Sequence, residues 1–167
     1  MDDIIAAMTA TYGSLSEPDF GVVSQRLRQQ PYRDLVAALD SRFEVQDDTD
    51  SNDDHGLGLV LDRGGRSWAL LLSVVGTYAA FGRIGQAWDA VLTDTSPNLH
   101  ADERWVLHEL RQAGVRALSQ AELEEHVDLM LFNTQPGDVR VYHALFSDIP
   151  GLPWDKEGLR RLGLIDG

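Results

Sequence analysis

Hydrophobic residues in the first 40 positions recur every three or four residues, which is the period of an amphipathic helix. This pattern predicts a first helix around Ile4 that ends at Gly13, and another helix that begins after Pro31. Between them, Ser16 has the character of a helix N-cap, because Glu17 and Pro18 follow it and both are tolerated in a first helical turn. We therefore expect the N-terminal third of the chain to be mainly helical.

At Phe43 the hydrophobic pattern changes to strict alternation, which is typical of strands. Leucines alternate through residues 57–61, and a glycine-bearing turn at residues 62–66 leads into residues 68–75. Both alternating sets of side chains in residues 68–75 are largely apolar, so this segment is predicted to be a central strand with cover on each face. Another strand is expected over residues 78–84.

The second half of the chain carries shorter patterns of both kinds. The expected helical segments are a turn at residues 88–92, a helix from Ala101 to the C′ residue Gly114, a brief helix introduced by the capping box of Ser119 and Glu122, and a last helix around residues 154–162. The expected strands are residues 115–118 and 127–131. The hydrophobic residues within 138–146 fit the period of a strand and also that of a helix.

Helices and strands occur in blocks rather than in regular alternation, and no repeat or linker divides the 167 residues. The predicted fold class is therefore α+β. We expect one globular domain over residues 1–167, with a mainly antiparallel or mixed sheet of about five to six strands and helices packed on its faces.

The chain is strongly acidic, with 27 Asp and Glu residues against 14 Lys and Arg residues and a net charge of −13. This charge repels phosphate, so nucleic acid is not an expected partner, whereas a basic protein would be attracted. Acidity can equally serve solubility alone. The start of the chain lacks a basic signal region and no apolar run is long enough to span a membrane, so the expected location is cytoplasmic. The preference for Arg over Lys suggests a GC-rich bacterial source.

An acidic run over residues 47–54 separates two of the predicted strands. Its members are Asp47, Asp48, Asp50, Asp53 and Asp54. The run resembles the start of a calcium-binding loop, but Asp53 takes the place of the required glycine and Leu59 that of the closing glutamate, which excludes that site. The run is either a mobile, solvated loop or a recognition loop that orders against a basic surface.

Residues with catalytic potential do not form a recognisable pattern. The absence of cysteine excludes disulfides, thiolate metal sites and cysteine nucleophiles. The five histidines lack the close spacing of a metal site, and phosphate-binding glycine loops and nucleophilic serine motifs do not occur. We predict no catalytic residue, metal or cofactor. The alternative is an enzyme or small-ligand domain with a pocket assembled from distant residues such as His126, Asp128 and Arg140.

These observations favour a non-enzymatic protein-binding module, most simply an immunity or antitoxin-like inhibitor that occludes a basic partner such as a toxin domain. The predicted partner-binding residues are Asp47, Asp48, Asp50, Asp53, Asp54 and Trp88. Trp88 is included because partly exposed aromatic residues often anchor interfaces. No membrane or nucleic-acid binding is expected. The protein is predicted to be a monomer or a homodimer, the latter through an exposed strand edge beside residues 127–131.

Overall fold

The computed structural model describes residues 1–166 of the chain. The helices are α1 (Asp2–Tyr12), α2 (Gly21–Arg28), α3 (Arg33–Asp40), α4 (Ala101–Gln112), α5 (Gln120–Leu123), α6 (Val141–Leu145) and α7 (Lys156–Arg161), with a 3-10 turn at Pro136–Asp138. The strands are β1 (Glu44–Asp47), β2 (Gly56–Arg63), β3 (Arg66–Ser73), β4 (Tyr78–Ile84), β5 (Trp88–Val91) and β6 (Arg116–Ala117). The predicted α+β fold class and helical N-terminal region are therefore confirmed.

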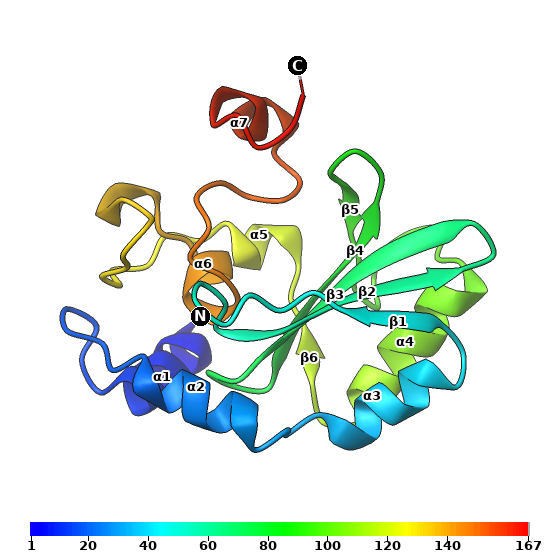
Figure 1. The fold of residues 1–167 in the computed structure, drawn as a ribbon, viewed down its shortest axis with the longest axis horizontal. Coiled ribbons are helices and arrows are strands. Elements are labelled where there is room, and N and C mark those ends of the chain that lie inside the picture. Colours follow the sequence, from blue (N-terminus) through cyan, green and yellow to red (C-terminus); the bar gives the residue numbers. More distant parts are fainter. Residues whose placement is uncertain (167) are drawn as a thin grey trace.

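The strands form one sheet in which β1 to β5 are neighbours in chain order and run antiparallel. Both β5 and β6 pair with β4, but at opposite ends of that strand. Residues 82–84 pair with β5, whereas Tyr78 and Ala79 pair with β6 in the parallel direction. The sheet is thus mostly antiparallel with one parallel pair, and Figure 1 shows its strands twisting across the centre of the molecule.

The central strand is β3, and both of its faces are buried. Trp68, Leu70 and Leu72 belong to a core formed with α3 and α4, while Ala69 belongs to a second core formed with α1, α5 and α6. Figure 1 shows α3 and α4 on one side of the sheet and α5 and α6 on the other. The expectation of a central strand covered on each face is confirmed, because alternate side chains of a strand point to opposite faces.

Several helix ends follow the capping signals in the sequence. Gly13 ends α1 with a φ of 75°, and Gly114 follows α4 with a φ of 73°, a conformation that favours glycine. Ser119 and Glu122 form the predicted reciprocal capping box at the start of α5. The longest helix, α4, has 12 residues. No helix within residues 1–166 combines the length and apolar content needed to cross a membrane.

Two predicted elements have a different structure. Residues 88–91 form strand β5 rather than a helical turn, because they pair with β4 across a hairpin that a local spacing pattern does not reveal. Residues 127–131 do not form a strand. Their backbone bonds reach loops instead, from Val127 N to Val139 O at 3.2 Å and from Met130 N to Leu15 O at 2.9 Å. The strand edge expected to pair two copies is therefore not present in this segment.

Two further expectations are corrected or resolved. Ser16 does not cap α2, which begins at Gly21. The carboxylate of Asp19 accepts a hydrogen bond from the Gly21 amide at 3.0 Å, while Ser16 bonds to the hydroxyl of Ser14. Residues 138–146 fitted two periods, and the tertiary structure selects helix α6, whose five residues are all buried.

A buried carboxylate, Glu103, joins α4 to the sheet. Its side chain is 1% exposed and accepts bidentate hydrogen bonds from Arg83 at 2.6 and 2.7 Å. It also accepts from the indole nitrogen of Trp68 at 2.9 Å and from the backbone amide of His100 at 2.7 Å. Neighbouring Asp102 binds Arg42 and Arg63. These contacts place negative charge at the N-terminus of α4, where the helix dipole favours it.

Glu103→Gln tests how far this cluster stabilises the fold. Burial alone would raise the pKa of Glu103, but hydrogen bonds from Arg83, Trp68 and His100 outweigh it and lower the pKa from 4.5 to about 2. A lowered pKa means that the stabilisation is complete above pH 4.5 and is lost as the pH falls toward 2. The variant should be about 2 kcal/mol less stable at pH 7. Urea unfolding from pH 7 to 2 should show a flatter pH dependence for the variant.

Glu109→Gln is the matched control, because Glu109 lies on the same helix and outside the cluster. It should retain the wild-type pH dependence. Equal slopes for the Glu103→Gln variant and the wild type would contradict the assignment.

Candidate functional site

The acidic loop, residues 47–54, is closed by its own hydrogen bonds. The amide of Asp54 donates to the carbonyl of Asp50 at 2.8 Å, and the amide of Asp50 donates to the carboxylate of Asp54 at 2.7 Å. The carboxylate of Asp50 accepts a hydrogen bond from the amide of Asn52 at 3.0 Å. Short polar side chains that bond to nearby backbone amides are typical of tight turns. The sequence therefore forms a compact turn here.

The loop is also fastened to the segment that follows α6, and Figure 1 shows it passing close to that helix. Asp54 forms a β-bridge with Ser147, and the amide of Asp148 donates to the carbonyl of Asp53 at 2.8 Å. The side-chain amide of Asn133 donates to the Asp53 carboxylate at 2.9 Å. These contacts join residues that lie 80 to 95 positions apart, so no local sequence pattern indicates them. The C-terminal half of the loop is therefore fixed to the rest of the protein by these contacts.

Three hollows border the acidic loop, and the predicted site residues are divided among them. Asp47 lines a hollow of about 450 Å³ beside α3, together with Tyr32 and Val36. Asp48, Asp50 and Asp54 line a hollow of about 260 Å³ over the sheet, and Trp88 lines the same hollow. Asp53 and Asp54 line a third hollow of about 260 Å³ that includes His55. We call the second the sheet groove and the third the His55 pocket.

The sheet groove has an apolar floor and an acidic rim. The floor is formed by side chains that face α6 from three neighbouring strands, namely Val60, Ala69, Leu71 and Ile84. Its wall on the C-terminal side includes Tyr142 and Phe146. Acidic residues enter only from the loop. The structure thus brings four of the six predicted residues, Asp48, Asp50, Asp54 and Trp88, to one groove, although Trp88 is more than 30 positions away from the loop.

Trp88 is more buried than an interface anchor usually is, with 9% of its surface exposed. Its ring lies against Gly82, because a Cβ atom built on Gly82 would come within 2.3 Å of the indole carbon Cε3. The ring centroid lies 5.9 Å from that of Trp154. Trp88 therefore shapes the end wall of the groove and offers a partner only a small part of its ring.

The surroundings of Asp54 disfavour the negative charge of its carboxylate. Burial raises the pKa of Asp54 above its usual 3.8, and the charges of Asp50 and Asp53 act in the same direction. The carboxylate is therefore harder to ionise than a free aspartate. An approaching cation would relieve this cost, because opposite charge favours the ionised form.

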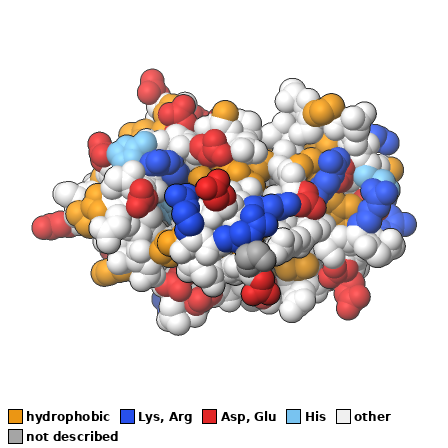
Figure 2. Space-filling view, turned by 90° about the horizontal axis from the view of Figure 1, so that it is seen from above, with side chains coloured by type: hydrophobic (Ala, Val, Ile, Leu, Met, Phe, Trp, Pro, Cys, Tyr) orange, Lys and Arg blue, Asp and Glu red, His pale blue; other side chains and the backbone are white. Residues whose placement is uncertain are grey.

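The molecular surface is not uniformly acidic. Figure 2 looks onto the side that carries α7, and Lys and Arg side chains form a row across the middle of that face. Helix α7 contributes to the positive charge with Arg160 and Arg161 in its last turn. Acidic side chains lie among these basic ones, so both signs of charge occur on this face.

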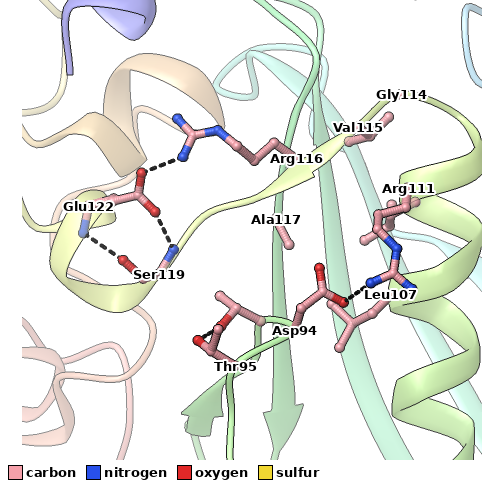
Figure 3. A pocket seen from close by; sticks show the side chains of 12 residues that line it. Asp94, Thr95, Leu107, Arg111, Gly114, Val115, Arg116, Ala117, Ser119 and Glu122 are labelled. Carbon is pink, nitrogen blue, oxygen red and sulfur yellow. Dashed lines mark hydrogen bonds and ion pairs between the residues drawn. The ribbon is translucent and has the colours of Figure 1, made fainter.

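Another hollow, of about 440 Å³, lies between α4 and β6 and is drawn in Figure 3. Its charged side chains are paired with one another. Arg111 contacts Asp94 at 2.7 Å, and Arg116 contacts Glu122 at 2.6 Å. Figure 3 shows the two pairs on opposite sides of the hollow. Because both arginines are neutralised within the protein, the hollow presents no free charge for a ligand.

The residues of the alternative enzyme or small-ligand hypothesis do not converge on one hollow. The side chain of Asp128 is 96% exposed and lies 3.9 Å from His126, which is itself exposed. The backbone of Arg140 pairs with that of His126 in an isolated β-bridge, but its side chain binds the backbone carbonyl of Gly137 at 3.1 Å and lines a hollow beside α7. Within residues 1–166, no group of three or more His, Asp or Glu side chains has an arrangement that could hold a metal ion.

Comparison with known proteins provides no assignment, because no family model, no curated protein and no solved structure matches the chain. The functional argument therefore depends on the geometry of the chain alone.

Sequence reasoning did not identify several residues that line the His55 pocket. Phe20, Phe132, Asn133 and Asp148 come from three distant segments. One available signal was the sequence Leu-Phe-Asn at residues 131–133, where an aromatic residue lies in a polar, loop-forming stretch. Burial of His55 had no such signal.

Asp54→Asn should stabilise the free protein at pH 7. Since the pKa of Asp54 is raised on folding, its ionisation disfavours the folded state, and this penalty is absent below pH 3.8 and complete above the raised pKa. Asparagine keeps an acceptor for the Asp50 amide and removes the charge. Thermal unfolding should show a higher midpoint for the variant at pH 7 and no gain at pH 3. Asp47→Asn, outside the turn, is the control; a lower midpoint for Asp54→Asn at pH 7 would contradict the interpretation.

Gly82→Ala should disturb the end wall of the sheet groove. The new methyl group would meet both Trp88 and the carbonyl oxygen of Ala90, which lies 2.9 Å from the Cβ position. We expect a loss of about 2 kcal/mol in unfolding free energy and a shift of the Trp88 indole N–H resonance. Gly58→Ala is the matched control on β2, because its nearest side-chain atom is at an ordinary 3.6 Å. Similar losses in the two variants would show that the Trp88 contact is not responsible.

Proposed function

We propose that this chain is a non-enzymatic protein-binding module, an immunity or antitoxin-like inhibitor that occludes a basic partner protein. The observation that supports this most directly is the sheet groove, where three aspartates of the acidic loop and Trp88 border one apolar floor. A partner surface with a basic residue beside an apolar residue would match this arrangement. The proposal includes a bacterial, cytoplasmic setting, and a toxin domain is the expected kind of partner.

The acidic loop would act first on the rate of association. A net charge of −13 attracts a cationic surface over the range of a Debye length, about 8 Å at physiological ionic strength. The row of Lys and Arg side chains in Figure 2 would repel the same surface from the α7 face. Steering of this kind accelerates the encounter and fixes the orientation of the partner.

The apolar floor would then supply most of the lasting affinity. Leu71 and Ile84 are partly exposed in the groove, so a partner side chain placed there would remove apolar surface from water. The loop is already fastened to residues 147 and 148, so little conformational entropy is lost on binding. Inhibition would follow from occlusion, because the partner's basic active cleft would be covered.

A variant with five substitutions tests this proposal. In this five-Asn variant, asparagine replaces Asp47, Asp48, Asp50, Asp53 and Asp54. A partner is first identified by capture from the native cytosol with the wild-type chain, or by testing the product of the adjacent gene. The variant should then associate with the purified partner at least tenfold more slowly at low salt, and its association rate should lose most of its salt dependence. Stopped-flow measurements between 20 and about 300 mM salt provide the readout.

Control variants with exposed acids elsewhere, Glu157→Gln and Asp128→Asn, should associate like the wild type. The partner's own activity must also fall when the wild-type chain is added. A captured partner that binds the five-Asn variant at an unchanged rate, or that keeps full activity in the complex, would overturn the proposed function.

A further inference from the structure

The His55 pocket combines aromatic faces with carboxylates in one hollow of about 260 Å³. It borders the sheet groove at Asp54, which lines both hollows. Its walls come from α2, from the acidic loop and from the segment around residue 132. The pocket therefore continues the acidic surface from which the proposed function was argued.

Aromatic rings form one side of the pocket. Phe20 stacks on His55 with a centroid distance of 5.3 Å and an interplanar angle of 18°. Phe132 lies 5.6 Å from Phe20 and is 87% exposed. A phenylalanine exposed to this degree leaves its ring available to a side chain of a partner. Burial lowers the pKa of His55, which keeps its ring uncharged at neutral pH.

Carboxylates form the other side. Asp148 is 3% exposed, and its Oδ2 atom accepts hydrogen bonds from the amides of Phe132 and Asn133, both at 2.9 Å. Its Oδ1 atom is buried and has no hydrogen-bond partner within residues 1–166. A buried carboxylate oxygen without a partner is rare and is costly in free energy. Asp53 and Asp54 add two further acidic groups to the lining.

We propose that the His55 pocket binds a single cationic side chain of the partner protein, an arginine, between the ring of Phe132 and the carboxylates. This inference rests on the proposed function and adds the chemistry of one anchor residue to it. A guanidinium group can stack on an aromatic face and at the same time donate charge-assisted hydrogen bonds to carboxylates, which a neutral planar group does more weakly and an anionic group does not do. The acidic lining of the pocket and the exposed ring of Phe132 match these two capacities.

N-acetyl-arginine amide is the probe, and it requires no partner protein. Titration into the full-length wild-type chain should shift the NMR resonances of the His55 and Phe132 rings with saturable binding in the millimolar range. N-acetyl-citrulline amide has nearly the same shape without the charge and should bind at least tenfold more weakly. N-acetyl-lysine amide should bind with intermediate affinity, because it is charged but lacks a planar group.

Phe132→Ala and Asp53→Asn should each weaken arginine binding by about three- to tenfold. Both side chains are at or near the surface, so neither change should unfold the protein. Met130→Ala and Glu157→Gln are the matched controls, because they are exposed residues outside the pocket, and they should bind the probe like the wild type. Equal binding of the arginine and citrulline probes, or unchanged affinity in Phe132→Ala, would overturn the inference.

The tests of the arginine anchor and of the proposed function can fail independently. If the arginine probe binds as described but the five-Asn variant associates with the partner normally, the pocket has an affinity for arginine but the inhibitor proposal fails. If the probe does not bind but the five-Asn variant associates slowly, the inhibitor proposal holds and the arginine anchor is wrong.

Discussion

Burial of β3 on both faces is the constraint on which the rest of the structure depends. A strand with apolar side chains on both sides must be covered twice, so α3 and α4 are drawn to one face and α1, α5 and α6 to the other. The buried contact between Glu103, Trp68 and Arg83 then fixes where α4 begins relative to the sheet. Because β3 is central, its neighbours β2 and β4 are positioned by pairing with it.

The groove and the pocket both result from incomplete cover on the α6 face. Helix α6 has only five residues, so it shields part of that face and leaves Leu71 and Ile84 partly exposed at its side. The acidic loop closes the remaining gap by bonding to Ser147 and Asp148 directly after α6. The apolar floor and the acidic rim of the sheet groove therefore both depend on the contact between the acidic loop and the segment after α6. This contact also explains why Asp54 borders both hollows.

Local signals predicted much of the fold correctly. Glycines 13 and 114, the Ser119 capping box and the two-glycine turn before β3 act through neighbouring residues, and their structures agree with the sequence. Errors arose where the partner was distant. Residues 88–91 became a strand because β4 was available to pair, whereas residues 127–131 did not, because their backbone bonds reach loop residues. For the site, five aspartates were evident as a cluster, but their division among three hollows was not.

By itself, the sequence determined the fold class, the central position of β3 and the concentration of negative charge between β1 and β2, since periodicity and charge are properties of consecutive residues. Only the tertiary structure decided that Trp88 lies across a groove from Asp48, and that Phe20, His55, Phe132 and Asp148 share a pocket. The physical reason is that these contacts join segments up to 128 positions apart, from Phe20 to Asp148. Such contacts form only after the sheet and its helices have packed, so no local pattern of residues records them.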